Sequence, residues 1–332
     1  MKNFKLLGGL FPLKRLTHSK ELIIPGNIPK DVHLPDQIFS ILVRFSALAL
    51  IGLFISMAVV IFIKSWPAFS HFKWEFFTRS VWDSWRQEYG ALSLIYGTVV
   101  SSLLALCLAI PVSLALALFL NELAPKWLSV VLGFIVEMLA AIPSIVYGLW
   151  GVFVLAPFLR ESVQPFLSKY LGGYALFSGS FYGVGMMCAG VILAIMITPT
   201  ISSISKEVFR SIPHTNKEAV LSLGSTRWEM FKVALLRGGF SGLVGAVILG
   251  FGRAFGETMA VTMVIGNKIS LDPSLFAPSQ TMASMLATQY GEGDEFQLSA
   301  LTAVGFTLFM VSLIFNSLAV FLVWKIRKRY GK

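Results

Sequence analysis

The stretch GFSGLVGAVILGFGRAFGETMAVTMVI, residues 239–265, decides how this chain is folded. It is long enough to cross a bilayer core of about 30 Å, which takes roughly 20 apolar residues at about 1.5 Å each. Its only charged residues are Arg253 and Glu257. A buried helix of a soluble protein rarely needs so long an apolar run, so the stretch predicts a membrane span that carries two opposite charges.

The rest of the chain repeats the pattern. Of its 332 residues, 56% are hydrophobic and 13% charged, well below the roughly 25% charged residues of a soluble domain. We therefore predict an all-α polytopic membrane protein with six transmembrane helices. The predicted spans are Ile38–Ile63, Leu92–Leu120, Trp127–Val154, Phe181–Ile204, Gly239–Ile265 and Leu298–Trp324.

The basic residues set the predicted orientation. With the N-terminus inside, the inner segments hold 18 lysines and arginines and the outer segments hold 7. The positive-inside rule then places both termini in the cytoplasm. Residues 1–37 are predicted to be a cytoplasmic extension, and residues 38–332 the six-helix transmembrane domain. This topology accounts for the net charge of +10 without nucleic-acid binding.

The sequence offers little sign of chemistry within the chain itself. Its two cysteines, Cys107 and Cys188, lie in apolar runs, where they are expected to be small buried hydrophobic residues. They form neither a disulfide framework nor a metal-ligand spacing. A GxxxxGK[ST] phosphate loop is missing from the sequence, so ATP hydrolysis by that route is not expected. We predict no enzyme activity, no metal and no cofactor in this chain.

The longest predicted inner connection, residues 205–238, has organised helix signals. Thr215 stands three residues before Glu218, and Thr226 three before Glu229, which predicts two capping boxes. Gly224 lies between them, where a helix can end in a left-handed cap. The pattern predicts a helix, a glycine turn and a second helix outside the bilayer. Such a segment either binds a soluble partner or is a folded loop without a binding role.

The charges of the opening stretch need a specific environment. A spacing of four places Arg253 and Glu257 on one helix face, and a lone mid-bilayer charge costs at least ~2.5–3.5 kcal/mol. The face should therefore point into the bundle or a wet cavity. Glu137 is a second intramembrane carboxylate and a candidate partner for Arg253. The pair either fixes helix register or serves an oxyanion, which the planar guanidinium suits.

Glycines on the same predicted helix indicate close packing. Gly238 and Gly242, and again Gly252 and Gly256, are spaced as small-xxx-small pairs, which let a second helix approach. The approaching helix belongs either to this chain or to a partner chain.

The inner loop resembles a known motif. EAVLSLGSTRWEMFKVAL, residues 218–235, is similar to the EAA loop of ABC importer permeases. The resemblance implies a type I importer-like permease fold whose short coupling helix fits a groove on an ATP-hydrolysing subunit. The residues that it implies in ATPase coupling are Glu218, Ala219, Gly224, Trp228 and Phe231. The family usually has Leu-Pro near the end of the motif, where this chain has Leu236-Arg237.

A second resemblance is more specific. GFGRAFGETMAVTMVIGN, residues 250–267, with AAIPSIVYGLWGVFVLAP and SLFAPSQTMASMLA, resembles permeases of the phosphate-specific (Pst) ABC importers. The match runs from about residue 92 to the C-terminus. It implies a subunit of an ATP-driven phosphate importer in the bacterial inner membrane, with Arg253, Glu257 and Glu137 along the translocation path.

The resemblance also implies partners. They are a second permease, two copies of an ATPase subunit that binds the ATP, and an extracytoplasmic phosphate-binding protein. Two alternatives stay open. A gradient-driven anion transporter or channel would also use an intramembrane Arg–Glu pair, although it needs no ATPase handle. An ABC permease for another oxyanion, such as molybdate or sulfate, is the other alternative.

Overall fold

The long apolar runs of the sequence form helices, because backbone N–H and C=O groups in lipid must be paired within the segment. The computed structural model describes residues 34–291 and 293–330. The long helices are α1 (Leu34–Phe72), α3 (Leu92–Leu118), α8 (Met186–Ser211), α11 (Phe240–Gly256) and α14 (Glu295–Tyr330). In the described part of the chain, the helical segments long and apolar enough to cross a membrane are Gln37–Phe72, Leu92–Leu123, Ser144–Leu171, Met186–Ser211 and Glu295–Lys325. The bent pair of Arg227–Arg237 and Phe240–Gly256 makes a sixth if it is a single span.

Shorter elements connect these helices. The α-helices are α2 (Glu75–Thr78), α4 (Lys126–Ala141), α5 (Ser144–Trp150), α6 (Ala156–Phe158), α7 (Gln164–Leu171), α9 (His214–Ser222), α10 (Arg227–Met230), α12 (Met259–Val264) and α13 (Met282–Gln289). Wider π-helical turns form η1 (Phe119–Leu123), η2 (Gly151–Leu155), η3 (Leu159–Val163) and η5 (Phe231–Arg237), and η4 (Ala175–Phe177) is a 3₁₀ turn. Two short antiparallel strands, β1 (Trp82–Asp83) and β2 (Glu88–Tyr89), form a hairpin.

The chain divides into two compact units, residues 1–57 and residues 58–332, and the division falls inside α1. In the first unit, the described residues form the beginning of that helix. Nearly all of the predicted extension, residues 1–37, lies outside the described residues. Its cytoplasmic position, and a domain boundary at residue 37, therefore stay predictions.

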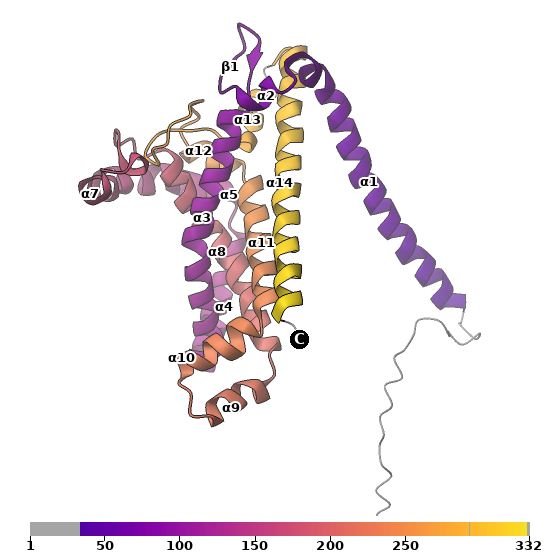
Figure 1. The fold of residues 1–332 in the computed structure, drawn as a ribbon, viewed down its shortest axis with the longest axis vertical. Helices are drawn as coiled ribbons and strands as arrows, with labels where there is room; N and C mark the ends of the chain where they lie inside the picture. The colour runs from indigo at the N-terminus through magenta and orange to yellow at the C-terminus, as the bar shows by residue number, and fades with distance from the viewer. Residues whose placement is uncertain (1–33, 292, 331–332) are drawn as a thin grey trace, which may run out of the picture. The chain divides into compact units, whose positions relative to one another are not determined.

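The core of the second unit is a packed group of α3, α8 and α11 (Figure 1). Small residues let these helices approach closely. Gly190 of α8 lies against Leu104 of α3, and Gly250 of α11 lies against Ile201 of α8. Buried side chains of α8, such as Ile197, fill the space between them. Without water between helices in lipid, such close backbone packing is a main source of stability.

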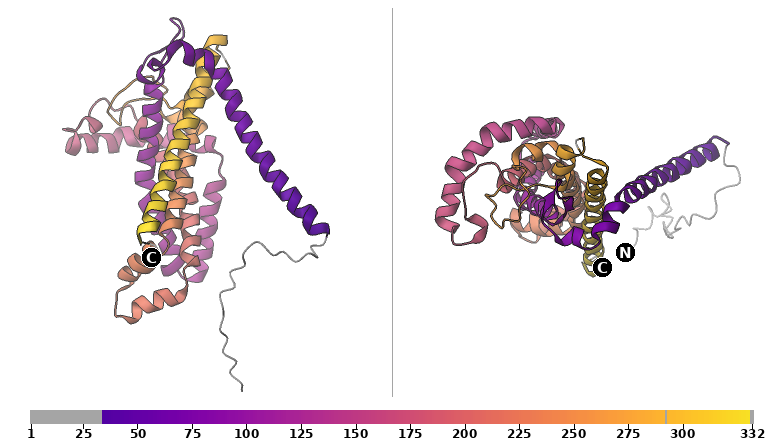
Figure 2. Two further views of the ribbon diagram at one scale, coloured as in Figure 1. Left: turned by 45° about the vertical axis from the view of Figure 1, so that its right-hand side comes forward. Right: turned by 90° about the horizontal axis from the view of Figure 1, so that it is seen from above.

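The third predicted span, Trp127–Val154, is wrong as one continuous helix. Pro143 has no N–H to give to the carbonyl of Leu139, and a residue before proline avoids the helical region. Ile142 accordingly has ψ 130°, and α4 ends there. The Tyr147 hydroxyl donates to the Leu139 oxygen at 2.8 Å, so the broken turn is satisfied. The following segment, α5 to α7, runs across the direction of α3 and α8 in both figures (Figure 2).

The fifth predicted span, Gly239–Ile265, is also broken. Helix α11 ends at Gly256, and Glu257 takes an extended conformation with ψ 123° before α12 begins. The two breaks lie near each other because α5 packs on α12. Gly148 makes this contact, lying against Ala260 and Met263. Discontinuous helices of this kind are common beside transporter binding sites.

A sharp bend precedes α11, although the proline typical of the motif is missing. The helical segment Arg227–Arg237 meets Phe240–Gly256 at 71°. Gly238 and Gly239 occupy the bend, and Gly239 lies against Val208 of α8. The bend is therefore made by glycines packed on a neighbouring helix rather than by a proline.

An extended loop between α12 and α13 enters the helix bundle and pairs with the start of α8. The backbone oxygens of Val264, Ala277 and Leu275 accept from the N–H groups of Gly185, Met186 and Met187. These N–H groups belong to the start of α8 and have no partner within the helix. Phe276 of the loop is fully buried. The loop is tolerated inside the bundle because its carbonyls pair with donors that a helix start leaves free.

Gly97 gives a direct test of this packing. A Cβ at Gly97 of α3 would collide with the backbone oxygen of Gln280 in the same loop, whereas a Cβ at Gly245 of α11 meets nothing within 4 Å. Overpacking of this kind typically costs about 1–3 kcal/mol. We expect Gly97→Ala to lower the thermal stability of the detergent-solubilised protein clearly, and Gly245→Ala to leave it nearly unchanged. Equal melting temperatures for the two variants would contradict the described loop position.

Candidate functional site

Arg253 lies in the last turn of α11 and is exposed on the surface of the chain. Its Nη1 donates to the Thr200 hydroxyl of α8 at 3.3 Å. Among the described residues, no carboxylate lies within 4.0 Å of its guanidinium nitrogens. The predicted pairing of Arg253 and Glu257 on one helix face is therefore wrong, because the helix ends between them.

Glu257 has a different role in the structure. Its Oε1 accepts from the backbone N–H of Ala260 at 3.3 Å, so the side chain caps the start of α12. A carboxylate is favourable there because the first N–H groups of a helix are unpaired and carry partial positive charge. Glu257 is half-buried. The structure thus keeps both charges beside the helix break but gives each its own partner.

Sequence reasoning missed two polar neighbours of Arg253. Thr200 follows Pro199 in α8 and is the hydrogen-bond acceptor for the guanidinium. The phenol of Tyr147 in α5 lies within electrostatic reach of the same charge. Neither residue stands near Arg253 in the sequence, so only the packing of α5, α8 and α11 brings the three together.

The surface around Arg253 is open. Gly252 and Gly256 flank it on α11, and an added Cβ at either position would meet nothing within 4 Å. Gly242, from the first predicted glycine pair, instead packs on Val208 of α8. One glycine pair thus serves packing within the chain. The other leaves the backbone beside the guanidinium accessible.

Glu137 lies on α4 and is exposed. The structure does not bring it into an ion pair with Arg253 or with any other described basic residue. One turn earlier, Gly133 lies beside the ammonium group of Lys206 on α8. The predicted partnership of Glu137 with Arg253 is therefore not observed.

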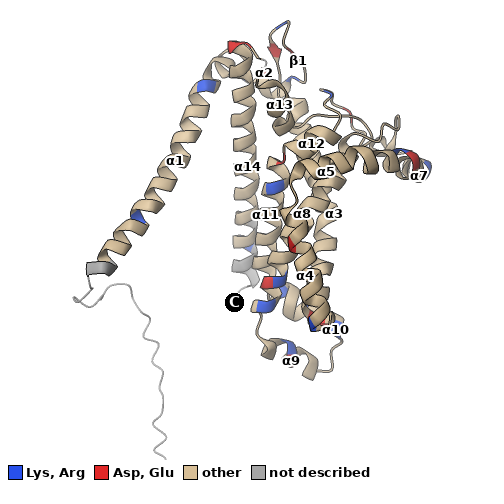
Figure 3. Ribbon diagram, turned by 180° about the vertical axis from the view of Figure 1, so that it is seen from behind, with Lys and Arg blue, Asp and Glu red and all other residues tan. Residues whose placement is uncertain are grey.

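Arg253 is unusual in its position, because few charged residues lie along the length of the bundle. Figure 3 shows that charged residues of the bundle gather mainly toward its two ends, with few along its length. An exposed arginine in an apolar helix cannot face lipid without a large cost. The face of α11 that carries Arg253 must therefore meet either another protein segment or water.

The loop after α8 forms the expected helix, glycine turn and helix. Gly224 has φ +80°, which confirms the predicted left-handed cap. The second capping box is also confirmed, since Glu229 N–H donates to the Thr226 hydroxyl and Thr226 N–H to the Glu229 carboxylate. The first is wrong. Pro213 already precedes α9 with an extended backbone, so Thr215 lies inside the helix instead of at its cap.

Most of the predicted coupling residues point outward. Glu218, Ala219, Gly224 and Trp228 are exposed. Phe231 is buried in the cluster under α10 and stacks on Trp228, with ring centroids 5.4 Å apart. Four of the five predicted residues thus form an available surface, and Phe231 anchors that surface to the bundle.

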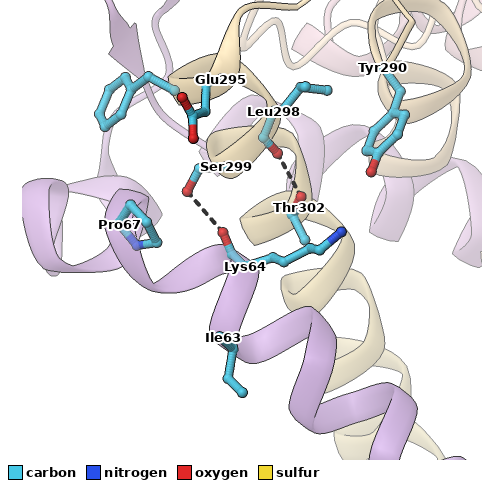
Figure 4. Close-up of a pocket in the computed structure, with 9 residues that line it drawn as sticks. Ile63, Lys64, Pro67, Tyr290, Glu295, Leu298, Ser299 and Thr302 are labelled. Carbon is cyan, nitrogen blue, oxygen red and sulfur yellow. Dashed lines mark hydrogen bonds between the residues drawn. The ribbon is translucent and has the colours of Figure 1, made fainter.

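A cavity elsewhere in the second unit is separate from these residues. It has a volume of about 680 Å³ and is lined by Ile63, Lys64 and Pro67 of α1 and by residues at the start of α14 (Figure 4). In Figure 4 the Ser299 hydroxyl donates to the backbone oxygen of Lys64, at 3.0 Å. None of the predicted site residues lines this cavity.

Comparison with known proteins places these features in a family. The family of binding-protein-dependent transport system inner membrane components matches residues 109–328. The chain is 41% identical to the phosphate transport system permease protein PstC of Pasteurella multocida, over 90% of this chain and 95% of that protein. It is 35% identical to a probable PstC of Methanocaldococcus jannaschii, over 81% and 87%.

The fold is also similar to that of a solved structure. A chain from a bacterial ABC transporter involved in alginate import superposes with a TM-score of 0.57 at 17% identity, covering 87% of this chain and 96% of that one. The similarity supports the helical permease fold predicted for the sequence. The chain therefore belongs to the family of binding-protein-dependent transport system inner membrane components, among the phosphate transport system permease proteins PstC.

Proposed function

We propose that this chain is the transmembrane subunit of an ATP-driven importer of inorganic phosphate. The observation that carries the proposal is Arg253, an exposed guanidinium without a carboxylate partner among the described residues of an apolar helix bundle. In a family whose relatives are named phosphate transport permeases, a cation in that position has a clear use. It faces a wet path along which a phosphate ion travels.

We infer that Arg253 attracts the anion and that its surroundings allow the anion to leave again. A guanidinium offers a planar fork of donors that matches two oxygens of a phosphate ion. Thr200 holds one side of that fork, and the bare backbone at Gly252 and Gly256 leaves room for the anion. Glu257, close along the chain, adds negative charge that opposes tight binding. Weak enough binding is needed because transport requires release as well as capture.

The exposed residues of the loop after α8 connect the chain to ATP hydrolysis in this proposal. We assign Glu218, Ala219, Gly224 and Trp228, anchored by Phe231, to contact with an ATPase subunit, and we place this end of the bundle in the cytoplasm. Both termini then lie on the same side of a bacterial inner membrane. Closure of the ATPase dimer would move α9, and the two helix breaks would let the outer and inner halves of the path open in turn.

The same proposal predicts the other subunits of the transporter. The partners are a second permease that faces Arg253, an ATPase dimer that binds the ATP, and an extracytoplasmic phosphate-binding protein. This chain itself acts as a permease without a catalytic site of its own. Lipid surrounds the remaining apolar helix faces.

The proposal is tested with the assembled transporter in proteoliposomes. We expect uptake of radiolabelled phosphate to require ATP, to stop with vanadate, and to persist when proton and sodium gradients are collapsed. Uptake that follows a gradient and ignores vanadate would favour the gradient-driven alternative. Competition by molybdate or sulfate, at concentrations equal to phosphate, would show a different oxyanion as the substrate.

A further inference from the structure

One ion pair in the coupling loop differs from the others in the described chain. The Lys217 ammonium of α9 lies 2.5 Å from the Glu122 carboxylate of η1. The two side chains are only 9% and 19% exposed, and the residues are 95 positions apart. Each of the other four described ion pairs joins residues at most four positions apart, with side chains 33% to 79% exposed. Local, exposed pairs of that kind contribute little.

The carboxylate of Glu122 is held in place by a second donor. Asn121 Nδ2 donates to the same oxygen at 2.6 Å. Both residues belong to the wide π-helical turn that continues α3 at its end. In the same turn, the backbone carbonyl of Leu120 accepts from the Ser129 hydroxyl of α4 at 2.7 Å. Asn121 therefore holds the carboxylate, and the Ser129 hydrogen bond ties the turn that carries it to α4.

The two faces of α9 have different surroundings. Lys217 is buried and Val220 half-buried on the side toward the bundle, whereas Glu218, Ala219 and Leu221 are exposed on the other. Extended Pro213 directly precedes α9, and the turn at Gly224 follows it. This helix has nine residues. It can transmit movement from a bound partner to α3 only if its inner face is held against the bundle.

We propose that the Lys217–Glu122 ion pair is a positioning link that transmits movement of the coupling helix to α3. The link rests on the proposed function, because it matters only if α9 receives force from an ATPase. Lys217 ties the inner face of α9 to the fixed carboxylate, and the exposed face remains free to contact the partner. Removing either charge leaves the other buried and unpaired, so α9 keeps the apolar contact of Val220 with the bundle but carries α3 less effectively.

The experiment compares single and reversed charges in the assembled transporter. Lys217→Met and Glu122→Gln are expected to keep the ATPase bound, but to lower the phosphate transported per ATP hydrolysed by about tenfold. The double variant Lys217→Glu with Glu122→Lys should recover at least half of the ratio, and Lys217→Arg should retain most of it. Glu207→Gln is the matched control, since it breaks an exposed pair with Arg210 at the end of α8 and should change nothing.

The ratio of transport to hydrolysis separates this link from a merely structural role. Normal coupling in both single variants would overturn the proposal. Failure of the reversed pair, with Lys217→Arg also inactive, would do the same. Thermal melting of each purified variant identifies a variant whose coupling is lost because it unfolds. In that case the coupling ratio of Lys217→Arg, which keeps the charge, tests the proposal. If the unaltered transporter itself does not move phosphate, the proposed function fails. The link is then tested with a fluorescent label at the end of α3. The proposal expects ATP hydrolysis to change the fluorescence of the unaltered transporter but not that of the two single variants. An equal change in all three would overturn it.

Discussion

Replacing Arg253 with methionine is expected to reduce phosphate uptake by about 100-fold or more while the transporter still assembles. A hydrogen bond to a charged group contributes about 1.5–3 kcal/mol, the planar fork can donate two of them to a phosphate ion, and every 1.4 kcal/mol is tenfold. Assembly should survive because the side chain contacts only Thr200 by hydrogen bond among the described residues. The measurement is ATP-dependent uptake of radiolabelled phosphate into proteoliposomes, with co-purification of the partner subunits recorded for the same preparation.

Two companion variants sharpen this result. Arg253→Lys keeps the charge but loses the planar fork, so it should retain partial uptake with a weaker apparent affinity. Arg210→Met removes an exposed arginine at the end of α8 and should behave as the unaltered protein. Normal uptake by Arg253→Met would mean that the guanidinium is only part of the scaffold.

The second large effect is expected at the glycine turn of the coupling loop. Gly224 has φ +80°, and a left-handed backbone costs an ordinary residue about 1–2 kcal/mol, more if it is β-branched. We expect Gly224→Val to shift α9 against α10 and to weaken ATPase association about tenfold. The amount of ATPase subunit that co-purifies with the tagged permease, titrated against ATPase concentration, measures the change.

The matched control for this variant uses the same position. An added Cβ at Gly224 would meet nothing within 4 Å, so backbone conformation rather than side-chain volume is at stake. Asparagine adopts the left-handed region more readily than other residues, so Gly224→Asn should bind the ATPase almost normally. A Gly224→Val variant that binds as tightly as Gly224→Asn would remove the turn from the coupling mechanism.

The sequence predicted the helical membrane fold because each long apolar run carries its own signal. It also predicted Gly224 and the Thr226–Glu229 cap, since both depend on a few neighbouring residues. The first cap failed because Pro213, two residues before Thr215, starts α9 earlier. Local signals were therefore reliable only where no stronger local signal competed with them.

The two helix breaks needed information that the local pattern lacks. A proline such as Pro143 disfavours a continuous helix, but only Tyr147, whose hydroxyl reaches Leu139, shows how a complete break is satisfied. At Glu257 nothing in the apolar run indicated an end to the helix. The carboxylate caps α12, and packing of α12 on α5 holds the short helix in place.

The remaining site contacts depend on residues far apart in the chain. Thr200 meets Arg253 across 53 positions, and Lys217 meets Glu122 across 95. One sequence gives no signal for such pairs, because neither partner is unusual in its own segment. These contacts exist only once the helices have packed.

The loop that pairs with the start of α8 has an electrostatic consequence. An unoccupied helix start attracts anions, because its aligned peptide dipoles present partial positive charge there. In this chain, carbonyl oxygens of Val264, Ala277 and Leu275 already occupy those amides. The start of α8 thus exerts little pull on a passing anion and does not hold it in a competing minimum. Under the proposed function, Arg253 then supplies the positive charge that a phosphate ion meets along its path.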